Sequence, residues 1–153
     1  MNIPEDRAEG TGLEAARGAF RFPDAREFSA LQLAYLGDTL HDLYARSLLL
    51  TRRAPVGALH RQAVRLVSAE AQSRMLARIG EALSDEERDA VRRGRNAQAK
   101  HASPRNQLPA DYHRATGLEA LWGFLYVRGE TERMLSLMDL AFRGEETEWE
   151  KQN

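Results

Sequence analysis

Two carboxylates stand inside apolar stretches of this chain, and their types and positions point to metal chemistry. Asp38 ends residues 33–38 (LAYLGD), and Glu119 lies within residues 116–121 (TGLEAL). Desolvating a carboxylate in such surroundings is unfavourable unless a cation or hydrogen bonds compensate it. Hard cations such as Mg²⁺ bind one or two carboxylates, with water and substrate oxygens in the other positions. These two acids, 81 positions apart, therefore suggest a shared metal site.

A simpler interpretation of the same acids needs no metal. Asp38 would face solvent on its helix, and Glu119 would pair with an arginine such as Arg114 or Arg128. His41 and Asp42 follow Asp38 by one helical turn and share a face with it. They would either orient the site or, as is more common for such residues, serve ordinary surface roles.

Basic residues are segregated along the chain although its net charge is only −1. No acid lies between Asp42 and Glu70 or between Asp89 and Asp111, and each interval holds five Lys or Arg residues. Arginine suits phosphate oxygens because its planar fork donates two parallel hydrogen bonds. High-GC coding would produce the same arginine bias, and a basic segment can simply be solvated, so a polyanion-binding role stays open at this point.

Composition restricts the class of protein. The chain has 153 residues, 42% of them hydrophobic, which fits one globular domain. It has no cysteine, which excludes disulfides and thiolate metal sites. The start of the chain has no apolar signal segment, and no stretch approaches the roughly 20 apolar residues of a membrane span. We therefore expect a cytoplasmic protein that does not enter membranes.

The hydrophobic periodicity predicts only helices, because no segment shows the alternation of a strand. We expect helices over 27–50, 55–79, 84–92, 110–127 and 131–142. Ser29 is a plausible cap for the first, with an apolar face that includes Leu43 and Leu50. Residues 84–87 (SDEE) have the form of a capping box. Gly, Asn and Pro residues in 94–109 predict a long loop. We expect residues 1–26 to form a flexible leader, residues 27–143 the folded domain and residues 144–153 an acidic tail.

The two carboxylate motifs, taken together and in this order, resemble the signature helices of the ribonuclease III family, most closely those of its short Mini-ribonuclease III members. The resemblance covers about residues 31–140. It implies an all-α, ribonuclease III-like fold and a double-strand-specific endoribonuclease that matures the ends of 23S ribosomal RNA precursors. Asp38 and Glu119 would be its catalytic, metal-binding pair for Mg²⁺, with Mn²⁺ an open alternative. Hydrolysis would leave 5′-phosphate and 3′-hydroxyl ends.

The resemblance extends to the second basic interval, which is similar to the Arg/Gly/Asn loop and SPKN-like stretch of the Mini enzymes, with Arg105 in place of lysine. The RNA-binding residues that it implies are Arg92, Arg93, Arg95, Asn96, Lys100, Arg105 and Asn106. Ala34 and Thr116 stand where long ribonuclease III enzymes carry further acids. This departure favours the Mini subfamily and one well-held ion rather than two.

The resemblance also implies partners. We expect a homodimer with one active site for each RNA strand, and a large-subunit ribosomal protein that presents the substrate. The expected binding of duplex RNA by the catalytic core alone would be sensitive to salt. Two alternatives from other classes are a non-catalytic duplex-RNA-binding ribosome-assembly protein with the same fold and a helical protein-interaction module.

Overall fold

The structure is a computed structural model, and it describes residues 12–99 and 108–145. All regular elements in these ranges are helices, as the periodicity predicted. They are α1 (Gly12–Gly18), the 3₁₀ turn η1 (Ala25–Glu27), α2 (Ala30–Leu50), α3 (Val56–Leu66), α4 (Ala69–Ile79), the 3₁₀ turn η2 (Gly80–Ala82), α5 (Asp85–Gln98), α6 (Pro109–Val127) and α7 (Thr131–Phe142). No helix within this described part is long and apolar enough to cross a bilayer.

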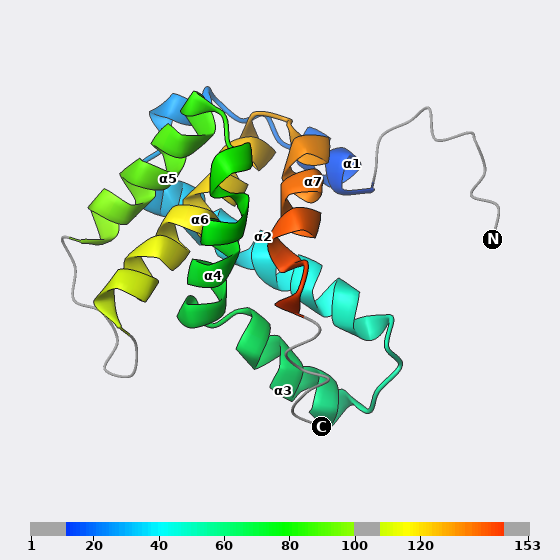
Figure 1. Cartoon of the computed structure of the whole chain (residues 1–153). Coiled ribbons are helices and arrows are strands. Elements are labelled where there is room, and N and C mark those ends of the chain that lie inside the picture. The colour runs from blue at the N-terminus through cyan, green and yellow to red at the C-terminus, as the bar shows by residue number, and fades with distance from the viewer. Residues whose placement is uncertain (1–11, 100–107, 146–153) are drawn as a thin grey trace.

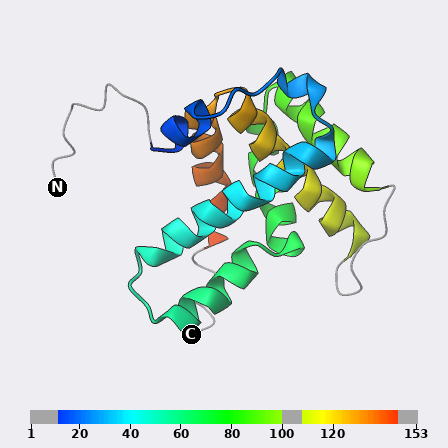
Figure 2. The same ribbon diagram turned by 180° about the vertical axis from the view of Figure 1, so that it is seen from behind.

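Helix α6 forms the centre of the molecule. It packs against α2, α4 and α5, and more lightly against α7 (Figure 1). Every residue from Leu121 to Val127 is buried, so α6 has no solvent-facing side over its second half. Seen from behind, α2 runs across α6, while its C-terminal half extends beside α3 (Figure 2). The two predicted catalytic acids are therefore on the helices that cross at the core.

Local capping signals worked as the sequence predicted. Ser29 caps α2 by accepting a hydrogen bond from the Gln32 amide at 3.1 Å. Ser84 and Glu87 form the capping box of α5, with bonds of 3.2 and 2.8 Å. Such caps satisfy main-chain amides that have no partner within the helix. Helices α2 and α5 accordingly begin directly after Ser29 and Ser84.

Two of the expected helices differ from the structure. The helix expected over 55–79 is two helices, because the chain turns at Val67 and Ser68 caps α4. Helix α5 continues to Gln98, so residues 94–98 of the expected loop are helical. Gly94 permits this, since a Cβ there would lie 2.9 Å from the Cα of Gly117 on α6. A glycine that signals a loop in sequence here allows two helices to pack closely.

The expected apolar face of α2 was also partly wrong. Leu43 and Leu50 are exposed, while Ala34, Gly37 and His41 are buried. Small residues are buried because α6 approaches α2 too closely for leucine. His41 is fully buried and links three elements: its Nδ1 accepts from Trp122 Nε1 at 3.2 Å, and its Nε2 donates to the Leu66 carbonyl at 3.0 Å. The surface role expected for His41 is therefore wrong.

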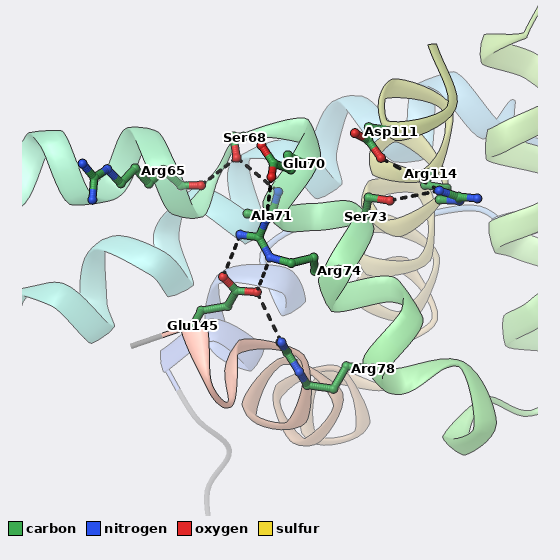
Figure 3. A network of polar contacts seen from close by, with 10 residues as sticks. All are labelled: Arg65, Ser68, Glu70, Ala71, Ser73, Arg74, Arg78, Asp111, Arg114 and Glu145. Carbon is green, nitrogen blue, oxygen red and sulfur yellow. Dashed lines mark hydrogen bonds and ion pairs between the residues drawn. The ribbon is translucent and has the colours of Figure 1, made fainter. Parts of the chain in front are cut away.

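The two ends of the described chain pack on the helices. The structure differs from the predicted flexible leader over residues 12–26, because Arg17 of α1 donates to the carbonyl of Tyr126 at 2.7 Å and Ala25 is buried. Glu145, expected in the acidic tail, is also buried and accepts from Arg74 and Arg78 of α4 (Figure 3). Residues 1–11 and 146–153 lie outside the described residues.

Candidate active site

The two motif acids meet where α2 crosses α6. A Cβ on Gly37 would overlap the main-chain oxygen of Glu119, and a Cβ on Gly123 would overlap that of Leu33. The two backbones therefore touch at two points, each made possible by a glycine. Because Asp38 follows Gly37 directly, this crossing brings its side chain to Glu119, and the two carboxyl groups share a hydrogen bond.

The electrostatics of this pair are unfavourable without a counter-charge. Burial raises the pKa of Glu119 to about 9, and the charge of Asp38 and the hydrogen bond with Asp38 act in the same direction. Asp38 is exposed, whereas Glu119 is half-buried. At neutral pH Glu119 is thus protonated and donates its hydrogen to Asp38. One proton holds together two groups that would repel each other when ionised.

The pair opens into a cavity of about 350 Å³ between α2, α4, α5 and α6. Small side chains form part of its wall, namely Ala34, Ala115 and Thr116. Thr116 directs its hydroxyl to the Tyr112 carbonyl at 3.0 Å, so its methyl group and main chain are what remain at the wall. The small residues leave room beside the carboxylates for a hydrated ion and a phosphate.

Comparison with known proteins decides the family. A family model described as the ribonuclease III domain matches residues 31–130, which contain both acids. The chain belongs to the ribonuclease III family. It is an endoribonuclease of the Mini-ribonuclease 3 branch. The resemblance inferred from the two motifs is therefore confirmed.

Relatives of this ribonuclease III branch match along most of their length. A Mini-ribonuclease 3 from Symbiobacterium thermophilum is 46% identical over 112 residues, covering 72% of this chain and 85% of the relative. One from Thermoanaerobacter sp. is 41% identical over 114 residues, covering 74% and 80%. A crystal structure of a Fusobacterium nucleatum protein has 29% identity and a TM-score of 0.72, covering 80% of this chain and 98% of that one. The all-α ribonuclease III fold is confirmed.

The donor set of the site fits a hard divalent cation, the kind of ion that ribonuclease III enzymes use. Two carboxyl groups face each other and need positive charge between them if both are to ionise. No further His, Cys, Asp or Glu joins them to make a group of three within residues 12–99 and 108–145. Water and substrate oxygens would therefore supply the remaining ligands, as they usually do for Mg²⁺.

The pairing of Glu119 with Arg114 or Arg128 that the metal-free interpretation expected is not found, whereas Asp38 is exposed as that interpretation expected. Arg114 contacts Ser73 at 3.4 Å, and Arg128 pairs with Glu86 and Glu130, so neither guanidinium reaches Glu119. The expected surface role of Asp42 is confirmed, because it accepts from Arg46 at 3.0 Å on the exposed side of α2.

The predicted RNA-binding residues of this ribonuclease III chain divide into three groups. Arg92, Arg95 and Asn96 are exposed on one side of α5, and Arg92 pairs with Asp89. Arg93 is half-buried and lines a separate cavity of about 760 Å³ together with Asp85 and Asp89. The third group lies outside the described residues and contains Lys100, Arg105 and Asn106.

Three polar residues of the cavity escaped the sequence interpretation: Gln72, Gln98 and Tyr112. Gln72 and Gln98 are buried although they are polar. The position of Gln72 carried a signal, since it lies three residues after Ala69 and four before Leu76, which are both buried. A polar side chain at a core position of an amphipathic helix deserves a search for its partner.

Proposed function

We propose that this ribonuclease III protein is a Mg²⁺-dependent endoribonuclease that cuts double-stranded RNA at the site formed by Asp38 and Glu119. The observation that carries the proposal is that these two acids meet where α2 crosses α6, beside a cavity lined in part by small side chains. Two negative charges are costly to bring together. A fold that places both carboxylates side by side is therefore best explained by a positively charged ligand that both of them bind.

Each residue has a defined task in this proposal. When bound, Mg²⁺ would neutralise negative charge on the phosphate and lower the pKa of a water molecule bound to the ion. Asp38 and Glu119 hold that charge in place, and Glu119 gives up its proton to do so. Ala34, Ala115 and Thr116 leave space for the scissile phosphate. In-line attack by water would leave 5′-phosphate and 3′-hydroxyl ends, with no part for the RNA 2′ hydroxyl.

The exposed face of α5 is the proposed contact for the RNA backbone. Gln98 at the end of α5 lines the cavity, so Arg95 and Asn96 lie less than one helical turn before the site. Phosphates on either side of the cut could therefore bind along Arg92, Arg95 and Asn96, followed in sequence by Lys100, Arg105 and Asn106. Duplex RNA is recognised mainly through its phosphates and 2′ hydroxyls. Arg93, beside two acids, is the weakest member of the proposed set.

The biological substrate and assembly are proposals that come from the family resemblance. We infer that the substrate is the 23S ribosomal RNA precursor in the cytoplasm, presented by a large-subunit ribosomal protein. We also infer a homodimer, because two sites are needed to cut both strands of one duplex in a single encounter. Light scattering on the purified protein would test the dimer, and a mass of one chain, 17.3 kDa, would contradict it.

The deciding experiment is cleavage of an end-labelled ribosomal precursor stem with and without Mg²⁺. Wild type should cut both strands only with the metal. Asp38→Asn and Glu119→Gln keep the side-chain shape and remove a ligand charge, so they should bind the stem and leave it intact. Asp42→Asn is the matched control on the same helix. Within residues 12–99 and 108–145 the side chain of Asp42 accepts hydrogen bonds from the surface residue Arg46, so this variant should cut normally.

Binding without cleavage by wild type would contradict the proposal. That result would favour the non-catalytic, duplex-RNA-binding ribosome-assembly role, which predicts equal binding with and without metal. Absence of any salt-dependent RNA binding would favour a protein-interaction module.

A further inference from the structure

One buried amide oxygen at the wall of the candidate cavity has no hydrogen-bond partner. Gln72 is 3% exposed, and its Nε2 donates to the Val67 carbonyl at 3.1 Å. That bond identifies the nitrogen and the oxygen of the amide group. It leaves Oε1 without a hydrogen-bond donor. Within the described residues, this is the single buried side-chain atom of its kind. Native proteins rarely leave a buried acceptor without a donor, so a missing ligand is the expected explanation.

The surroundings of this oxygen identify a small donor. Gln72 lines the same cavity as Asp38 and Glu119, reaching it from α4. The oxygen itself has almost no accessible area, so a donor can reach it only if the side chain shifts slightly, and that donor must be small. The cavity volume of about 350 Å³ corresponds to roughly ten water molecules at about 30 Å³ each. A cation with its inner water shell therefore fits within it.

A hydrated divalent cation supplies such donors. Water molecules bound to a cation are polarised and donate strongly, and Mg²⁺ usually keeps several of them in protein sites. Two carboxylates leave most positions around the ion to water. An acceptor that is not a ligand itself can then fix the orientation of one of these molecules, as outer-shell partners do in other metal sites.

We propose that Gln72 is a positioning residue of the metal site, whose Oε1 accepts a hydrogen bond from a water molecule bound to the cation held by Asp38 and Glu119. This inference rests on the proposed function of the site. It adds a third protein group, from a third helix, to the two acids.

The test measures binding of the metal alone, without RNA. Free Mn²⁺ gives an electron paramagnetic resonance signal that is lost on binding, and Mg²⁺ is then measured by competition. Gln72→Met keeps the side-chain length and removes the oxygen, so it should weaken Mn²⁺ binding by about tenfold. Gln72→Glu places a charged oxygen there and should bind Mn²⁺ at least as tightly as wild type. Both variants lose the amide donor to Val67, so their difference reports on the oxygen.

The control is Gln62→Met, which makes the same change at a half-buried glutamine of α3. Gln62 does not line the cavity, so its variant should keep the wild-type Mn²⁺ affinity. Circular dichroism of each variant checks that it is folded. Weaker binding by Gln72→Met with wild-type or tighter binding by Gln72→Glu supports the proposal.

Each other outcome overturns it in a distinguishable way. Wild-type affinity in Gln72→Met, or equal weakening in both Gln72 variants, assigns Gln72 a purely structural role and leaves the proposed function intact. An effect of Gln72→Met that occurs only on RNA binding assigns the missing donor to a ribose hydroxyl. If wild type binds no Mn²⁺, or if Asp38→Asn binds it unchanged, the metal site of the proposed function fails and the role of Gln72 fails with it.

Discussion

At the scale of single residues, the property that matters most is the proton shared by Asp38 and Glu119. Ionising both an aspartate and a glutamate in contact costs free energy, because their charges repel. Burial is the main cause that raises the pKa of Glu119, so Glu119 is the acid that stays protonated. In the proposed site, the metal-free protein therefore holds a proton on Glu119 that a bound cation would displace. We therefore expect both the stability of the protein and the proposed metal affinity to depend on pH.

The first prediction concerns the stability of the metal-free protein. Glu119 has a pKa of about 9 when folded and about 4.5 when unfolded, so the folded state binds more protons between these values. Unfolding free energy should then fall as pH rises from about 5 to about 9. Glu119→Gln is a neutral isostere and should remove most of this fall. Urea unfolding in EDTA at several pH values measures it, and parallel pH profiles for the two proteins would contradict it.

The second prediction concerns metal binding. Because Glu119 must lose its proton to bind Mg²⁺, each ion bound at neutral pH should release close to one proton, and affinity should rise with pH up to about 9. Calorimetry in buffers of different ionisation enthalpy counts the released protons. Asp42→Asn should release the same number as wild type, whereas proton-neutral binding by wild type would refute the shared-proton description.

At the scale of elements, the α2–α6 crossing determines where the acids lie. The crossing depends on glycine because a helix with any side chain at residue 37 would hold the backbones apart. The same principle explains why α5 reaches Gln98, since Gly94 lets it pack against α6. Gly94, which the sequence places in a loop, is tightly packed in the structure.

We predict that Gly37→Ala destabilises the protein by about 3 kcal/mol, because the added methyl group would overlap the Glu119 carbonyl. The folded fraction of the Gly37→Ala variant should also lose metal binding, because the carboxyl groups of Asp38 and Glu119 would move apart. The matched control is Gly80→Ala, where the backbone is right-handed helical and nothing lies within 4 Å. That variant should be stabilised by about 0.5 kcal/mol. Thermal unfolding of both proteins gives the comparison, and equal effects would exclude the close crossing.

At the scale of the whole molecule, the end of α7 is fastened to α4 through Glu145. Its carboxylate accepts from Arg74 at 3.0 Å and from Arg78 at 3.4 Å, and Arg74 also reaches Glu70 on its own helix (Figure 3). Glu145 has a side chain 3% exposed, whereas that of Glu70 is 79% exposed. The two acids therefore share one arginine in very different surroundings.

We predict that Glu145→Ala lowers the unfolding free energy by about 1–2 kcal/mol, because buried hydrogen bonds to charged groups are lost while the arginines can still be hydrated. Glu70→Ala should change it by less than about 0.5 kcal/mol, as expected for an exposed pair. Chemical denaturation of the two variants measures this difference. Similar losses would mean that burial of Glu145 contributes nothing.

The sequence by itself determined the helical class, the caps at Ser29 and Ser84, and the two acids that resemble a ribonuclease III site. These features depend on residues within a few positions of one another, so they can be read along the chain. Tertiary structure alone decided that Gly37 and Gly123 bring α2 against α6, that His41 is buried, and that Gln72, a residue lining the cavity, has a buried oxygen without a hydrogen-bond partner among the described residues. Such contacts join residues far apart in sequence, where periodicity carries no information about distance.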